Sequence, residues 1–280
     1  MLNQYKVKKY IKRGIEFTFL ILLVCFAFFP IFLMIINSFK NPLDLWVYPP
    51  KIFTRPTLKN FSRLAKESPR FFPGLLNSII ITIGALILSL LVSFPAAFAF
   101  SRYRHRLLNI PAQFLIIMRM FPPIVITIPL YPFLRSLGLV DNHLTLIVIN
   151  AVFSLSLATF MMKTFVDDVP IELEEAAMIE GCSKWKAFIR ITLPLTAPGI
   201  TAISIFVSIG IWNEYTFGYI FSSTKAVTAP VVITTVSSDV MGVNWGGLFA
   251  GCVIQLLPML IMVIAIHKYL IRGMQTGAIK

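Results

Sequence analysis

The sequence has little charge and few acidic residues. Only 13% of its 280 residues are charged, and 12 Asp and Glu stand against 25 Lys and Arg. A soluble domain is usually about 25% charged and about 45–50% apolar, whereas this chain is 57% hydrophobic. The composition therefore indicates an all-α membrane protein with several spans. Its apolar runs are too long and too uninterrupted for the alternating strands of a membrane barrel.

Sequence patterns for catalysis and metal binding are also absent. The chain has no Gly-x-x-x-x-Gly-Lys-Ser/Thr phosphate loop, no Gly-x-Ser-x-Gly elbow and no His-Glu-x-x-His pair. Its three cysteines and three histidines lie far apart, so we expect neither a disulfide framework nor a zinc site. We expect no enzymatic activity and no cofactor bound by this chain. Energy for uphill transport would have to come from an ion gradient or from a partner.

Six apolar runs predict six transmembrane helices, each long enough to cross a hydrocarbon core of about 30 Å. The runs cover approximately residues 17–39, 75–100, 110–134, 144–162, 197–221 and 246–266. The third run contains five prolines and Arg119, so we expect a kinked or broken helix there. The polar segment 40–73 is expected to hold one short helix, around residues 58–65. Residues 1–280 are interpreted as a single transmembrane domain.

The distribution of positive charge predicts the orientation in the membrane. Fifteen Lys and Arg residues lie in the N-terminal segment, the 101–109 loop, the 163–194 region and the tail, whereas two short loops carry only Arg135 and Lys225. Cationic short loops stay in the cytoplasm, so both termini are predicted to be cytoplasmic. Segment 40–73 is predicted to lie outside although it carries seven cations, because long segments cross the membrane largely regardless of charge. Because the cations mostly flank apolar runs, we expect membrane lipid, and no nucleic acid, as a partner.

Residues 167–194 form a polar loop between the fourth and fifth runs and hold half of the acidic residues. Asp168 is a plausible N-cap, and Pro170 is expected near the first helical turn. Gly181 can end this helix in a left-handed conformation. Ser183 can cap a second helix that runs to about Ile191, and Leu193-Pro194 is expected to end or kink it. The pattern predicts a helical hairpin. From the residues alone, it is either an amphipathic helix pair lying on lipid headgroups or a docking surface for a soluble partner.

Two charged residues lie inside apolar runs. Arg119 is either a structural cation, satisfied by carbonyls freed at Pro122 and Pro123, or part of a polar translocation pathway. Glu214, which follows Asn213 near the outer part of the fifth run, is either an interfacial residue that pairs or part of the same pathway. Charged groups are costly in lipid, so each should face protein or water.

The 167–194 loop resembles the EAA loop of the permease subunits of bacterial ATP-binding-cassette (ABC) importers. It matches that pattern without a departure, with Glu175-Ala176-Ala177, three residues, Gly181, nine residues, Ile191, one residue, then Leu193 and Pro194. Segments 121–123 and 212–214 and the tail 272–280 look like the carbohydrate-uptake branch of this family, in particular its maltose-type subunit with six spans.

The resemblance implies a type I importer permease in the cytoplasmic (inner) membrane of a bacterium or archaeon, moving a sugar or oligosaccharide inward. It implies a second homologous permease, two ATPase subunits that bind ATP and Mg, and an extracytoplasmic solute-binding protein. Glu175, Ala176 and Ala177 would form a coupling helix seated in the ATPase. Gly181 would make the turn, and the stretch from Ile191 through Leu193 and Pro194 would join the hairpin to the fifth span. Alternatives are another cargo, such as glycerol phosphate, and an ion-coupled carrier.

Overall fold

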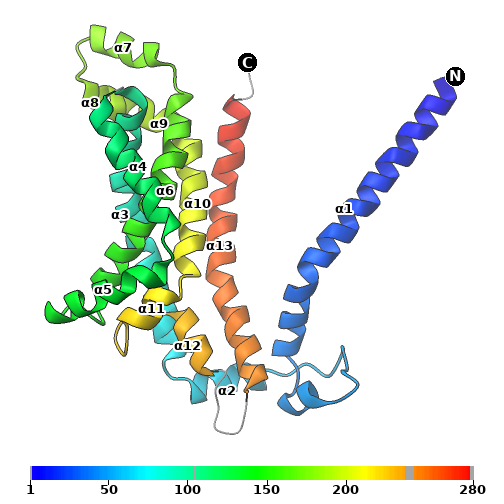
Figure 1. The fold of residues 1–280 in the computed structure, drawn as a ribbon. Coiled ribbons are helices and arrows are strands. Elements are labelled where there is room, and N and C mark those ends of the chain that lie inside the picture. The colour runs from blue at the N-terminus through cyan, green and yellow to red at the C-terminus, as the bar shows by residue number, and fades with distance from the viewer. Residues whose placement is uncertain (1, 104, 237–242, 278–280) are drawn as a thin grey trace. The chain divides into compact units, whose positions relative to one another are not determined.

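The computed structural model describes residues 2–103, 105–236 and 243–277, with side chains for 12–103, 105–108, 110–236 and 243–266. Every regular element within these ranges is helical (Figure 1). The side chains of the 272–280 tail lie outside the described residues. The long helices are α1 (Leu2–Ser38), α3 (Phe71–Arg102), α6 (His143–Asp167), α10 (Ala197–Trp212) and α13 (Trp245–Gly277).

The remaining elements are short. They are η1 (Pro42–Trp46), α2 (Lys59–Glu67), α4 (Arg106–Met120), α5 (Pro123–Ser136), α7 (Ile171–Ile179), α8 (Lys184–Ala187), η2 (Phe188–Thr192), α9 (Leu193–Leu195), α11 (Thr216–Phe221) and α12 (Ala229–Val236). Helix α2 confirms the short helix expected in the 40–73 segment. Helix α12 was not predicted, although Thr228-Ala229-Pro230 is a helix-start signal with proline in the first turn.

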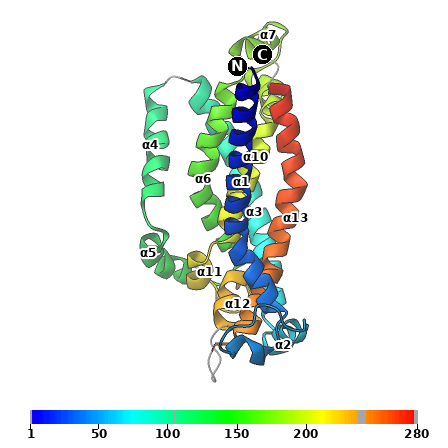
Figure 2. The ribbon, with the colours of Figure 1, turned by 90° about the vertical axis from the view of Figure 1, so that its right-hand side faces the viewer.

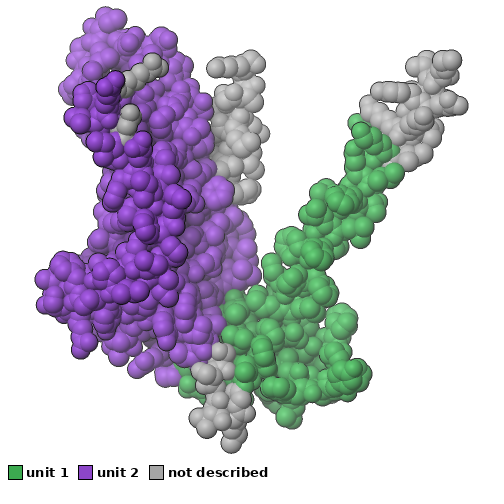
Figure 3. Space-filling view, in the orientation of Figure 1, with its two compact units in different colours: residues 1–68, 236–254 green, residues 69–235, 255–280 purple. Residues whose placement is uncertain are grey.

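The chain forms two compact units (Figure 3). Unit 1 comprises Met1–Ser68 and Val236–Ile254, and unit 2 comprises Pro69–Thr235 and Gln255–Lys280. Unit 2 contains the polar hairpin and most of the spans. Whether the two units function as the single domain expected from the sequence stays a prediction.

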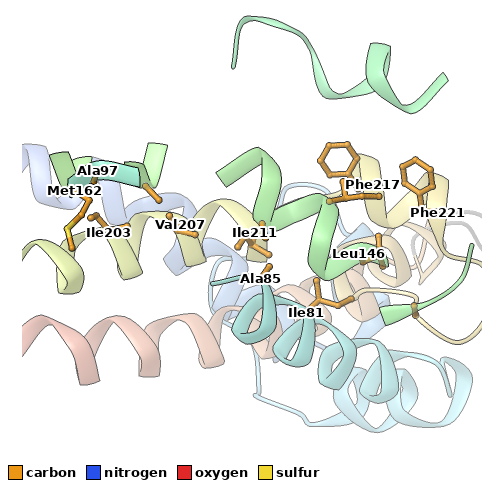
Figure 4. Packing of buried hydrophobic residues seen from close by; sticks show 14 of the residues in the cluster. Ile81, Ala85, Ala97, Leu146, Met162, Ile203, Val207, Ile211, Phe217 and Phe221 are labelled. Atoms are coloured by element: carbon orange, nitrogen blue, oxygen red, sulfur yellow. The ribbon is translucent and has the colours of Figure 1, made fainter. Parts of the chain in front are cut away.

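The core of unit 2 forms where α3, α6 and α10 pack against one another (Figure 4). Small residues recur at every fourth position of α3, and Ala85, Ser89, Ser93 and Ala97 are all completely buried. Small side chains let membrane helices approach closely, which provides the packing that lipid cannot replace. Ile203 of α10, also completely buried, adds a branched side chain to this core.

Four helices are long and apolar enough to cross a membrane: Lys12–Ser38, Phe71–Arg102, His143–Asp167 and Trp245–Ile266. Two bent helix pairs reach the same length and apolar composition when each pair is counted as one span: α4 with α5, bent by 101°, and Lys184–Leu195 with Ala197–Trp212, bent by 72°. The expected break in the third run is therefore present (Figure 2). Its cause is local. Phe121 and Pro122 each precede a proline and both are extended, with ψ of 129° and 134°, as proline requires of the residue before it.

Several predicted boundaries were wrong. The fifth span was expected to be one helix over 197–221, but α10 ends at Trp212 and α11 starts at Thr216. The polar residues between them account for the break, because the Glu214 carboxylate accepts hydrogen bonds from the first amides of α11. Helices α1, α3 and α6 extend past their apolar runs, since backbone hydrogen bonding does not stop where the hydrocarbon ends.

Candidate functional site

A helical hairpin occupies one end of unit 2, where α7 leads into the continuous helical stretch Lys184–Leu195 (Figure 1). Gly181 has φ +87°, a left-handed conformation that glycine adopts without steric cost. The amides of Gly181 and Cys182 donate to the carbonyls of Met178 and Ala177 at 3.1 and 3.0 Å, which closes the helix end. The Ser183 hydroxyl accepts from the next helix. The predicted turn and second cap are confirmed.

The predicted first cap was wrong. Asp168 ends α6 in a right-handed conformation, and α7 begins at Ile171 with Pro170 in the N-cap position. The apolar face of α6 continues to Val166, which is 1% exposed, so this helix runs on to Asp167. The second helix was expected to run to about Ile191 and to end or kink at Leu193-Pro194. It continues through Pro194, and the chain bends at Thr196.

The predicted coupling residues divide into two groups. Glu175 and Ala176 are exposed on α7, and Ala177 is half-buried. At the base of the hairpin, Ile191 and Leu193 are half-buried, and Leu193 packs against the apolar core of unit 2. Pro194, close to the bend, is exposed. One part of the hairpin is therefore free to meet a partner, and the other part is joined to the spans.

A buried carboxylate that sequence reasoning missed connects the hairpin to α3. Glu174 is 5% exposed, and its Oε1 atom accepts from Arg102 Nε at 2.9 Å, from Arg102 Nη2 at 2.8 Å and from the Thr192 hydroxyl at 2.8 Å. Arg102 Nη2 also donates to the Val169 carbonyl at 2.8 Å. Charge-assisted bonds of this kind are about twice as strong as neutral ones. Both helices of the hairpin and the end of α3 therefore meet at one group.

A second polar contact joins α3 to α6 beside this group. The Ser101 hydroxyl donates to Asp167 Oδ1 at 2.6 Å, and Lys163 Nζ donates to Asp167 Oδ2 at 2.6 Å. Arg102 Nη1 donates in turn to the Ser101 hydroxyl at 3.1 Å. Ser101, Arg102, Lys163, Asp167 and Glu174 therefore form a connected polar network at this end of α3 and α6.

Aromatic packing supports the second helix of the hairpin. The ring of Phe188 lies 4.7 Å from that of Phe98 on α3 and 5.1 Å from that of Trp185. Lys184 lies over the ring of Tyr103 at 5.2 Å, close enough for a cation–π contact. These contacts attach the second helix to α3 and to Tyr103 at its end, and the Glu174 group attaches the first helix, so both helices of the hairpin are joined to the end of α3.

Arg119, Asn213 and Glu214 lie on other elements and are not brought to the hairpin. Arg119 is exposed on α4. Asn213 Nδ2 donates to the Ile209 carbonyl at 2.9 Å, and Glu214 accepts from the amide of Phe217 at 2.8 Å. The two fifth-run residues therefore terminate α10 and start α11. Within the described ranges, no group of three or more His, Cys, Asp or Glu is placed to hold a metal ion.

The end of unit 2 opposite the hairpin is organised around Asp141, which follows α5 and has φ +60°. Its carboxylate accepts from the amides of Ser223, Lys225 and Ala226 and from the hydroxyl of Thr224. Burial raises the pKa of Asp141, but the hydrogen bonds from Lys225, Ser223, Thr224 and Ala226 together lower it by more than burial raises it. The pKa of Asp141 therefore lies well below its usual range. The loop before α12 is thereby fixed to the loop before α6.

The start of α3 adds two contacts to this region. Asn77 Nδ2 donates to the carbonyls of Lys225 and Val227 at 2.9 Å each, while its Oδ1 contacts His143 Nε2 at 2.8 Å. The amide of Ala229 donates to the buried Ser78 hydroxyl at 2.9 Å. Helix α3 therefore carries a polar network at each of its two ends.

A comparison with known protein families identifies the family of this chain. The family described as "Binding-protein-dependent transport system inner membrane component" matches residues 89–276, which include the hairpin, α10 and α13. The chain belongs to this family. The resemblance drawn from the EAA pattern is thereby confirmed, and this permease is a multi-pass membrane protein.

Relatives cover nearly the full length of this permease. The trehalose/maltose transport system permease protein MalG of Thermococcus litoralis is 33% identical over 264 residues, 93% of this chain and 94% of the relative. The diacetylchitobiose uptake system permease protein DasC of Streptomyces coelicolor is 30% identical over 254 residues, 90% of this chain and 91% of the relative.

A solved structure confirms the fold. One chain of a bacterial ABC transporter involved in the import of the acidic polysaccharide alginate superposes with a TM-score of 0.77 at 18% identity, covering 92% of this chain and 96% of the other. The predicted all-α architecture of an importer permease is therefore correct for this protein.

Proposed function

We propose that this permease is one of the transmembrane subunits of an ABC importer that moves a sugar or oligosaccharide into the cytoplasm. Relatives named for trehalose and maltose and for diacetylchitobiose, and a structural neighbour named for alginate, support a carbohydrate as the cargo. A second permease, two ATPase subunits that bind ATP and Mg, and an extracytoplasmic binding protein complete the importer. The solved alginate importer in complex with a substrate-bound periplasmic protein supports the last of these partners.

One observation carries the role of the hairpin. Its α7 surface, with Glu175 and Ala176, is exposed, while its inner side is held by the buried Glu174–Arg102 pair. A helix adsorbed on lipid headgroups would not need a rigid attachment to the spans, but a helix that is pushed by a soluble partner does. We infer that the hairpin lies in the cytoplasm, together with both termini, and docks on an ATPase subunit.

The arrangement of the hairpin explains how force would pass to the spans. Ala176 and Ala177 allow a close approach of the partner, and the Glu175 carboxylate is available to pair with a basic group on it. Gly181 sets the angle between the two helices. From Ile191 to Pro194 the second helix leads through the bend into α10, so that movement of the hairpin is passed to α10 directly and to α3 through Arg102.

Transport by the complete importer in proteoliposomes tests this proposal. Glu175→Lys is expected to lower ATP-driven uptake of a labelled oligosaccharide by at least about tenfold, because a hydrogen bond to a charged group contributes about 1.5–3 kcal/mol. Gly181→Pro should lower uptake as well, because proline cannot adopt the φ of +87° found at this turn. Glu67→Lys is the control, since Glu67 is an exposed carboxylate on α2, outside the hairpin. Normal uptake by both hairpin variants would refute the docking role.

The same vesicles test the class of transporter. We expect no uptake when this chain is reconstituted alone with an ion gradient and without nucleotide. Uptake under those conditions would identify an ion-coupled carrier. A panel of labelled sugars, with glycerol phosphate included, then identifies the cargo.

A further inference from the structure

The segment that follows α1 carries a surface that hairpin coupling does not use. Residues 40–73 contain seven Lys and Arg against Asp44 and Glu67. This charge opposes the rule that cations collect on the cytoplasmic side. A segment of this length can cross the membrane despite its positive charge, but its length does not explain why so many cations are present.

Hydrogen bonds hold this segment against the end of α1. The side-chain amide of Asn60, which is completely buried, donates to the carbonyls of Ser38 at 2.9 Å and Lys40 at 2.7 Å. The amide of Thr57 donates to the Phe39 carbonyl at 2.7 Å. These carbonyls belong to the end of a membrane-spanning helix, where no further helical amides are available. The chain between them is therefore kept at the level where α1 leaves the membrane.

Large apolar side chains project from this segment. Leu43 is 77% exposed, Trp46 67%, Tyr48 93% and Phe53 78%. Clustered exposure of this kind marks an interaction surface, and Trp and Tyr are enriched at the boundary between hydrocarbon and water. An acidic protein surface would complement the cations but leave these rings in water, so the combination favours lipid.

A recess of about 480 Å³ lies within the same segment. Its lining includes Lys51, Arg55, Lys59 and one carboxylate, Asp44. No ion-pair partner is found for the three cations among the side chains that the structure describes. Arg can bind phosphate oxygens in a bidentate manner, and Lys adds a compact charge. The recess therefore has the charge and the size for the phosphate-bearing headgroup of a phospholipid.

We propose that residues 42–59 bind anionic phospholipid at the membrane surface where α1 ends, with Lys51, Arg55 and Lys59 around the phosphate and Trp46, Tyr48 and Phe53 among the upper parts of the acyl chains (unit 1, green in Figure 3). The cations that oppose the orientation rule then have a partner in the membrane itself. The inference rests on the proposed function only in assigning the outer leaflet.

Trp46 fluorescence in the reconstituted importer provides the test. Brominated phosphatidylglycerol in phosphatidylcholine vesicles is expected to quench Trp46 more strongly than brominated phosphatidylcholine, and Trp46→Phe identifies the signal. The Lys51→Gln/Arg55→Gln/Lys59→Gln variant is expected to lower the preference for the anionic lipid by at least about tenfold, because each cation near an anionic surface contributes about fivefold.

Lys66→Gln/Arg70→Gln is the matched control, since it removes two exposed cations of the same segment outside the recess and should leave the preference unchanged. Equal quenching by both lipids, or none, would overturn the proposal. A different result would identify a protein-docking surface instead: neither the original protein nor the triple variant prefers the anionic lipid, and the triple variant captures the solute-binding protein more weakly. The measurement needs neither ATP nor transport, so its failure is independent of a failure of the transport assay.

Discussion

Replacing Arg102 by methionine removes one partner of the buried pair that joins the hairpin to α3. The two side chains are 11% and 7% exposed, with Arg102 Nη2 2.8 Å from Glu174 Oε1. Removing one partner of a buried ion pair costs about 3–5 kcal/mol, because the other charge is left buried. The Thr192 hydroxyl still donates to Glu174, so we expect about 3 kcal/mol, the lower end of that range.

This cost should appear as local opening of the hairpin. Hydrogen exchange reports such openings separately from global unfolding, and about 3 kcal/mol corresponds to a roughly 150-fold higher open population. Peptides covering 171–195 should therefore exchange much faster in Arg102→Met, while peptides from the α3–α6 core remain protected. ATP-driven uptake should fall, because a detached hairpin cannot pull on the spans.

Two comparisons make this experiment decisive. Lys12→Met breaks the exposed pair with Glu16, whose side chains are 79% and 62% exposed, and exposed pairs contribute only about 0–1 kcal/mol. Arg102→Met/Glu174→Met replaces both partners by apolar groups, which is often nearly neutral for buried pairs, so protection should return. If Arg102→Met accelerates exchange of the hairpin no more than Lys12→Met accelerates exchange of the surrounding part of α1, the buried pair does not hold the hairpin.

Three further predictions concern other parts of unit 2. A Cβ atom at Gly199 would collide with the ring of Phe165 on α6, so Gly199→Ala should destabilise the protein by about 1–3 kcal/mol, whereas Gly210→Ala, with open space around it, should not lower Tm. The lowered pKa of Asp141 means that its stabilising contribution is present above the unfolded pKa of about 3.9 and lost only as pH falls through the lower folded value. Protection of amides 223–226 should thus be equal at neutral and mildly acidic pH, and Asp141→Ala should abolish it at both. Because Arg119 is exposed, Arg119→Ala should change the free energy of unfolding by no more than about 0.5 kcal/mol. If Arg119 lines the translocation pathway, the same variant should lower uptake, whereas normal uptake with a lower Tm would indicate a structural role.

Local chemistry made part of the fold predictable from the sequence. Long uncharged runs imply helices because a membrane leaves no other partner for backbone groups. The break at Pro122 and Pro123 follows from the restricted backbone of residues before proline. The hairpin turn could be located because Gly181 tolerates a left-handed conformation and Ser183 caps the next helix. In each case, the cause and the structure lie within a few residues of one another.

Two predicted boundaries failed, one because of a distant contact and the other because of a polar group inside an apolar run. Asp168 has a side chain suited to an N-cap, but α6 is stabilised through Asp167 by Ser101 of α3, and the helix therefore continues past the expected end. The fifth run is apolar enough on average to suggest a single helix, yet the Glu214 carboxylate accepts hydrogen bonds from the amides of Phe217 and Gly218 at the start of a new one. Hydropathy indicates which residues can lie in lipid, but it does not show where one helix ends and another begins in a new direction.

The sequence by itself determined the membrane class, the approximate spans, the hairpin and the family, because periodicity, charge count and the EAA pattern are all properties of short stretches. Only the tertiary structure identified Glu174 and Arg102, which are separated by 72 residues, and the Asp141 group, which joins residues 82–85 positions apart. Nothing local distinguishes Glu174 from the exposed Glu175 beside it. Which of two adjacent carboxylates is buried depends on how α7 is rotated against α3, and that rotation is set by packing between distant helices.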